Sequence, residues 1–156
     1  NIGVLPIEIW GRLISAFAST LTGVLLFLLS KKHFGKITAT LTLFFYMFLP
    51  YSIYYGRTIL PDTMMVTASI LGIYFFDLYV SSTKKARFLY LFASTIFTAF
   101  SFLLKPFALF FVIPQLVLAW QAYKYKTILR LDLWVHALLA TIPLVAWRVW
   151  ISNFPE

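Results

Sequence analysis

The chain has 156 residues, of which 62% are hydrophobic, 20% aromatic and only 12% charged, with a mean hydropathy of +0.88. A soluble domain carries about 45–50% apolar and roughly 25% charged residues, so this composition excludes an ordinary soluble domain and predicts a multi-pass membrane protein. The sequence contains no cysteine, which excludes disulfides and thiolate metal sites.

The net charge of +8 is explained by membrane topology rather than by nucleic-acid binding. Most of the basic residues fall in three short Lys/Arg-rich loops, at 31–36, 84–87 and 124–130, each placed between apolar runs. Loops of this kind remain on the cytoplasmic side of a membrane. We therefore expect these three loops to be cytoplasmic, and we expect no nucleic-acid partner.

The apolar runs predict an all-α transmembrane fold of about six membrane-spanning helices, because about 20 residues are needed to cross roughly 30 Å of hydrocarbon. The predicted spans are 12–30, 37–54, 62–80, 88–104, 107–123 and 133–151. The basic loops follow the first, third and fifth spans, which places the other connections on the exterior face. Small and hydroxyl residues in 15–22 and 93–101 indicate close helix packing.

Residues 1–156 are expected to form a single transmembrane helical region. The sequence begins at Asn1 rather than Met, and stops at Glu156 just after a hydrophobic run. We therefore expect a segment of a longer polytopic helical bundle. Within it, Lys105-Pro106 separates the fourth and fifth spans. Proline disfavours helical geometry in the preceding residue, so two helices joined by a tight exterior turn are favoured over one kinked helix.

Arg57 lies between the second and third predicted spans, and Asp62 is the first residue of the third. Charged groups near a bilayer core are costly and mark functional sites. A guanidinium binds phosphate oxygens bidentately, so Arg57 is a candidate phosphate ligand. Asp62 would orient a hydroxyl or a metal, or hold Arg57 in place. The structural alternatives are a helix-start carboxylate for Asp62 and an interfacial side chain for Arg57.

Lys105 is a second candidate phosphate ligand on the same predicted exterior face, where an ammonium group acts as a point charge for an anion. Tyr54 and Tyr55 are candidates for lining a substrate groove, although aromatic residues gather at membrane interfaces regardless of function. His33 and His136 have no companion at metal-ligand spacing, so they are interpreted as structural and no metal site is predicted. Asp132 is predicted at a helix start.

Four segments, in this order, carry a family resemblance. They are 11–13, 34–39, 49–57 followed by Asp62, and 102–106. They resemble the polytopic membrane glycosyltransferases of the C superfamily, in the protein-mannosyltransferase and lipid A aminoarabinose-transferase branch. The resemblance covers roughly residues 11–120.

This resemblance implies transfer of a sugar from a polyprenyl-phosphate-linked donor to a protein, lipid or glycan acceptor on the exterior (periplasmic, lumenal or extracellular) face. Arg57 and Lys105 would stabilise charge on the leaving phosphate, and Asp62 matches an acidic residue near the active cleft of relatives. A divalent metal stays an open alternative, and no other cofactor is expected. Relatives carry their main catalytic acidic residue upstream of the segment that begins at Arg12, so we expect the general base outside this chain.

Two other functions remain open on the sequence alone. A transporter or flippase could use Arg57, Asp62 and Lys105 to guide an anionic or lipid-linked substrate, and inverted-repeat symmetry would favour it. A non-catalytic membrane subunit would need none of the three. An exterior acidic motif upstream would favour the enzyme.

Overall fold

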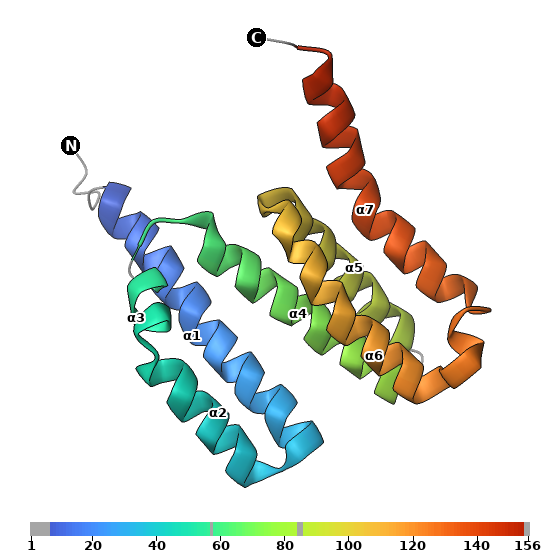
Figure 1. Cartoon of the computed structure of the whole chain (residues 1–156), viewed down its shortest axis with the longest axis horizontal. Coiled ribbons are helices and arrows are strands. Elements are labelled where there is room, and N and C mark those ends of the chain that lie inside the picture. Colours follow the sequence, from blue (N-terminus) through green and yellow to red (C-terminus); the bar gives the residue numbers. More distant parts are fainter. Residues whose placement is uncertain (1–6, 57, 84–85, 155–156) are drawn as a thin grey trace. The chain divides into compact units, whose positions relative to one another are not determined.

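The computed structural model describes residues 7–56, 58–83 and 86–154, and these residues form helices and turns without any strand (Figure 1). The all-α prediction is confirmed. The elements, in chain order, are α1 (Ile7–Phe34), α2 (Lys36–Phe48), α3 (Pro50–Tyr55), α4 (Pro61–Ser81), α5 (Arg87–Leu104), the 3₁₀ helix η1 (Pro106–Phe111), α6 (Val112–Tyr123), the 3₁₀ helix η2 (Lys124–Thr127) and α7 (Leu131–Ser152).

Five helical stretches in the described ranges are long and apolar enough to cross a membrane: α1, α4, α5, α7 and the continuous run Pro106–Thr127. The predicted second span, 37–54, is not one helix. Pro50 lacks a backbone N–H, and Leu49 before it is extended, with ψ of 125°. The run is therefore divided into α2 and α3. The 13 residues of α2 rise by only about 20 Å, which is less than the hydrocarbon thickness.

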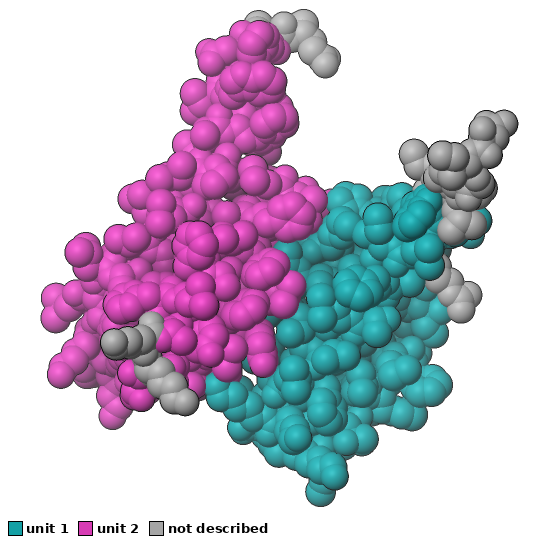
Figure 2. Space-filling view, turned by 180° about the vertical axis from the view of Figure 1, so that it is seen from behind, with its two compact units in different colours: residues 1–70 teal, residues 71–156 magenta. Residues whose placement is uncertain are grey.

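The chain forms two compact units, residues 1–70 and residues 71–156, coloured separately in Figure 2. The helix α4 contributes its first half to unit 1 and its second half to unit 2. Each unit is described by itself below.

In unit 1, α1 and α2 pack against each other across a tight turn. The turn is made by Gly35, whose φ of 88° lies in the left-handed region that glycine adopts without strain. Gly23 allows the close approach, because a Cβ there would lie 3.3 Å from both Leu43 and Tyr46. Small residues at such contacts are the usual means of packing helices in lipid.

Hydroxyl groups join the first half of α4 to α1. The Thr67 and Thr22 hydroxyl oxygens lie 2.8 Å apart, and both side chains are buried. Thr67 also lies within hydrogen-bonding distance of the carbonyls of Ala18, at 2.9 Å, and of Thr63, at 2.7 Å. These contacts satisfy polar groups internally, which a segment surrounded by lipid requires.

In unit 2, the predicted break at Lys105-Pro106 is confirmed. The helix α5 ends at Leu104, Lys105 is extended with φ −152° and ψ 131°, and η1 begins at Pro106. The second half of α4 packs on α5 through two contacts. The rings of Phe75 and Phe97 stack at 5.6 Å, and the Ser94 hydroxyl donates to the Gly72 carbonyl at 2.8 Å.

Gly72 generates a stability prediction, because a Cβ there would lie only 2.7 Å from Thr98 Oγ1 and 3.3 Å from Gln115 Nε2. We expect Gly72→Ala to lower the free energy of unfolding by about 1–3 kcal/mol, the usual cost of overpacking. Thermal denaturation in detergent measures it. Thr98→Ala removes the nearest clashing atom, so the cost of Gly72→Ala should shrink in that background. An equal cost in both backgrounds would contradict this packing account.

Candidate functional site

A polar recess in unit 1 surrounds Asp62, which lies half-buried in the first turn of α4. Its volume is about 70 Å³. Seven of its nine lining residues carry a side-chain oxygen, namely Ser19, Thr22, Tyr46, Ser52, Tyr55, Asp62 and Thr63, and the other two are Gly56 and Val66. We call this the Asp62 recess. Arg57, predicted beside it, lies outside the described residues.

The Asp62 recess is shaped by hydrogen bonds at the end of α3. The Thr63 hydroxyl donates to the Tyr55 carbonyl at 2.9 Å, which ties the start of α4 to the end of α3. Gly56 permits the approach to α1, because a Cβ there would lie 3.0 Å from the Ser52 carbonyl oxygen and 3.2 Å from Ser19 Oγ. A larger residue at position 56 would push α3 away from α1 and open the recess.

A larger groove adjoins the recess within unit 1. It has a volume of about 490 Å³ and runs along α1, α2 and α3. Four residues line both spaces: Ser19, Tyr46, Ser52 and Gly56. Much of the remaining wall is apolar, including Val24, Leu43, Met47 and Ile53. We call it the α1–α2 groove. The two spaces are therefore neighbours, and each combines hydroxyl groups with apolar surface, a combination that suits an amphiphile.

The two tyrosines proposed as groove-lining residues differ in position. Tyr55 is half-buried and lines the Asp62 recess. Tyr54 is 63% exposed and is not part of the recess wall. Their rings meet edge to face with centroids 5.3 Å apart, so Tyr54 supports the ring of Tyr55 from outside.

Lys105 belongs to unit 2, where it is half-buried at the turn between α5 and η1. Its backbone N–H donates to the Ser101 carbonyl at 3.1 Å, and its carbonyl accepts from the Ala108 N–H at 3.0 Å. These bonds hold the backbone of the turn. Asp62 lies in the other unit, so the structure does not place the two predicted site residues relative to each other.

Sequence reasoning missed the hydroxyl lining of the Asp62 recess. The small residues of 15–22 were expected only to pack helices. Ser19 and Thr22 are three residues apart, however, a spacing that puts two side chains on one face of a helix. Tyr46 extends the pattern from α2, with its hydroxyl donating to the Ser19 carbonyl at 3.1 Å. This spacing within α1 is the feature of the sequence from which the hydroxyl lining could have been predicted.

A second polar cluster lies in unit 2, around the start of α7. Asp132 is in the first turn of α7, as predicted, and it accepts hydrogen bonds from the side chains of Arg130 and Tyr79. Arg87 donates to the hydroxyls of Tyr123, at 2.8 Å, and Tyr79, at 3.1 Å. The bond to Asp132 raises the pKa of Arg130 above its ordinary value. We call these five residues the arginine cluster.

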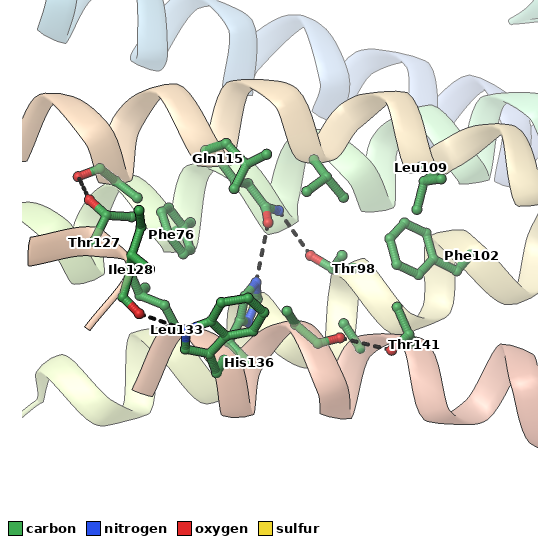
Figure 3. Close-up of a pocket in the computed structure, with 16 residues that line it drawn as sticks. Phe76, Thr98, Phe102, Leu109, Gln115, Thr127, Ile128, Leu133, His136 and Thr141 are labelled. Carbon is green, nitrogen blue, oxygen red and sulfur yellow. Dashed lines mark hydrogen bonds between the residues drawn. The ribbon is translucent and has the colours of Figure 1, made fainter. Parts of the chain in front are cut away.

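His136 has a structural role, although the sequence does not reveal its partners. It is buried, with Nδ1 2.7 Å from the Thr95 hydroxyl and Nε2 3.2 Å from Gln115 Oε1. Gln115 in turn donates to Thr98 at 3.0 Å (Figure 3). The network joins α5, α6 and α7. In the described ranges, no three His, Asp or Glu side chains lie close enough to hold a metal ion, so no step is assigned to one.

Residues 8–150 match a family model described as dolichyl-phosphate-mannose-protein mannosyltransferase. The match covers almost the whole chain and includes both units. No curated protein and no solved structure matches the chain.

The arginine cluster generates a stability prediction. The carboxylate of Asp132 accepts hydrogen bonds from Arg130 and lies near Arg87. Asp132→Asn therefore removes the negative charge that offsets the two guanidinium groups. We expect a loss of roughly 1–3 kcal/mol in the free energy of unfolding, the range for hydrogen bonds to charged groups. Chemical denaturation in detergent measures it. Lys126→Gln, an exposed charge change nearby, is the control and should cost less than about 0.5 kcal/mol. Equal effects of both changes would show that the cluster contributes nothing.

Proposed function

This chain belongs to the dolichyl-phosphate-mannose-protein mannosyltransferase family, and on that premise we propose that it transfers a sugar from a polyprenyl-phosphate donor to an acceptor on the exterior face of a membrane. Membership of the family makes the protein a membrane glycosyltransferase, and so favours an enzyme over a transporter or an inert subunit. Beyond this we propose the identity of the donor, the side of the membrane on which transfer occurs and the residues that contact the donor.

The adjacency of the Asp62 recess and the α1–α2 groove, which share four lining residues, is the observation that supports this donor. A polyprenyl-phosphate sugar has a polar head and a long apolar chain. The hydroxyl-lined recess suits the sugar, since hydroxyl side chains both donate and accept hydrogen bonds. The groove suits the first part of the apolar chain, because burial of that chain is favoured by its contact with apolar side chains.

Positive charge beside the donor's phosphate is the second part of what we propose. In the reaction, the bond between the sugar's anomeric carbon and the phosphate oxygen breaks, and that oxygen keeps the electron pair. The acceptor's hydroxyl oxygen forms the new bond and loses its proton. Cations near the departing phosphate stabilise the charge that develops on it. We assign this role to Arg57, next to the recess in sequence, and to Lys105.

Asp62 is proposed to contact the sugar from the recess. It lies in the first turn of α4 and lines the recess. A carboxylate accepts hydrogen bonds from sugar hydroxyls and orients them. The acceptor's proton passes to a general base, a role that we do not assign to Asp62.

The exterior location follows from the positive-inside rule. The three Lys/Arg-rich loops, 31–36, 84–87 and 124–130, are proposed to be cytoplasmic. Asp62 and Lys105 each lie at the opposite end of a membrane-length helix from one of these loops. The recess would then open on the exterior side.

The assignment of the two cations generates a kinetic prediction. Arg57→Ala and Lys105→Ala should each lower kcat/KM for a polyprenyl-phosphate sugar by about 100- to 1,000-fold, the scale of losing one charge-stabilising donor. Transfer of radiolabelled sugar by membranes containing the protein measures it. Lys36→Ala, a change in a predicted cytoplasmic loop, is the control and should leave transfer unchanged. Wild-type rates in both site variants, at normal membrane levels, would remove these residues from the donor site.

The role of Asp62 generates a second prediction. Asp62→Asn should lower kcat by about 100-fold, the scale of losing substrate positioning, while thermal denaturation in detergent stays near that of the wild type. Asp132→Asn is a matched control, since it makes the same change in the first turn of α7. It should lower stability and leave the transfer rate per folded molecule intact. If Asp62→Asn instead impairs only folding, Asp62 is a helix-start residue and takes no part in transfer.

A further inference from the structure

A cavity in unit 2 shares no lining residue with the Asp62 recess and has no role in the function described so far. It has a volume of about 370 Å³ and lies among α5, α6 and α7 (Figure 3). That volume falls within the range of ligand pockets in proteins, about 300–1,000 Å³. Apolar side chains provide most of its wall, among them Phe76, Phe102, Leu109 and Leu133.

The polar side chains of this cavity are already bonded to the protein. Gln115 lies between His136 and Thr98 and bonds to both. The hydroxyls of Thr127 and Thr141 donate to the carbonyls of Ala119 and Ala137, respectively, at 3.1 and 3.0 Å. The wall therefore presents a satisfied polar network and apolar surface, which suits an apolar occupant. A polar ligand would have to break these bonds.

The cavity is open to its surroundings, and those surroundings are apolar. Trp134 and Leu116 line it and are 61% and 59% exposed. Both lie on helices that are long and apolar enough to cross a membrane. The molecules that surround such helices are lipids, so an acyl chain can enter from the side.

One end of the cavity adjoins a concentration of positive charge. Thr127 and Ile128 line that end, and they directly follow Lys124 and Lys126, both exposed in η2.

The arginine cluster adds two guanidinium groups, from Arg87 and Arg130, against the single carboxylate of Asp132. Three cavity residues, Phe76, Ala119 and Leu133, pack in the same apolar cluster as Tyr79 and Tyr123. The charged end and the cavity are thus parts of one packed structure.

We propose that this cavity binds one anionic membrane lipid, with an acyl chain in the cavity and the phosphate group at Lys124 and Lys126. An ammonium group binds phosphate as a point charge, and clustered cations beside a membrane helix attract anionic lipids. Zwitterionic lipids offer the same chain without the net charge, so they bind less tightly. The site is separate from the Asp62 recess and does not depend on the proposed transfer reaction.

Native mass spectrometry of the detergent-purified protein, after delipidation, tests the proposal. It is titrated with phosphatidylglycerol and, separately, with phosphatidylcholine of the same acyl chains. We expect one phosphatidylglycerol to be retained with higher affinity. Lys124→Gln combined with Lys126→Gln should weaken that binding by roughly 30-fold, from about fivefold per cation, and should leave phosphatidylcholine binding unchanged.

Two further variants separate the chain from the headgroup. Ala137 lines the cavity and is exposed, so Ala137→Phe should fill the cavity with little risk to folding and abolish retention of the lipid. Leu138→Phe is the matched control on the neighbouring, exposed position and should have no effect. Equal retention of both lipids, or retention that survives Ala137→Phe, would overturn the proposal. So would equally tight binding of glycerol phosphate, which has no acyl chain.

Discussion

The proline at position 50 is the constraint on which the arrangement of unit 1 depends. Without it, the apolar run from Lys36 to Tyr55 would continue as one membrane-length helix. Because Pro50 has no N–H and holds Leu49 extended, the chain forms the short helix α3. Gly56 at its end then approaches Ser19, and the Tyr55 carbonyl accepts the Thr63 hydroxyl. A broken span thus produces the Asp62 recess, and non-helical backbone near the membrane lines a cavity.

Internal satisfaction of polar groups is a feature of each unit. In unit 1, hydroxyl pairs such as Thr22 and Thr67 lie between apolar helices. In unit 2, His136 and Gln115 bond to each other in the same way. Since lipid offers no hydrogen bonds, each such network stabilises one arrangement of its helices. The hydroxyls of Ser19, Tyr46 and Thr63 beside Asp62 are bonded within the protein in the same way. The feature that distinguishes the Asp62 recess as a candidate substrate site is a carboxylate that lines a space.

The sequence predicts the helical class, the family and the break at Lys105-Pro106, because hydropathy and proline act locally. It does not predict that the second apolar run is divided into two helices, since a proline at position 50 is also compatible with the end of a single span. Nor does it reveal partners distant in sequence, such as Thr95 and Gln115 for His136, because those depend on packing. The position of Asp62 in the first turn of a helix can be predicted from Pro61, because proline favours the first position of a helix. Its hydroxyl surroundings come from α1 and α2, and the roles of Arg57 and Lys105 stay predictions.

The central claim is that the polar recess beside Asp62 receives the head of a polyprenyl-phosphate sugar. Photo-crosslinking tests it most directly, using a donor that carries a diazirine next to the phosphate and membranes that contain the protein. The account predicts label on peptides from residues 46–63, lost when unlabelled donor competes. Competable label confined to other segments of the protein, with none on residues 46–63, would contradict it.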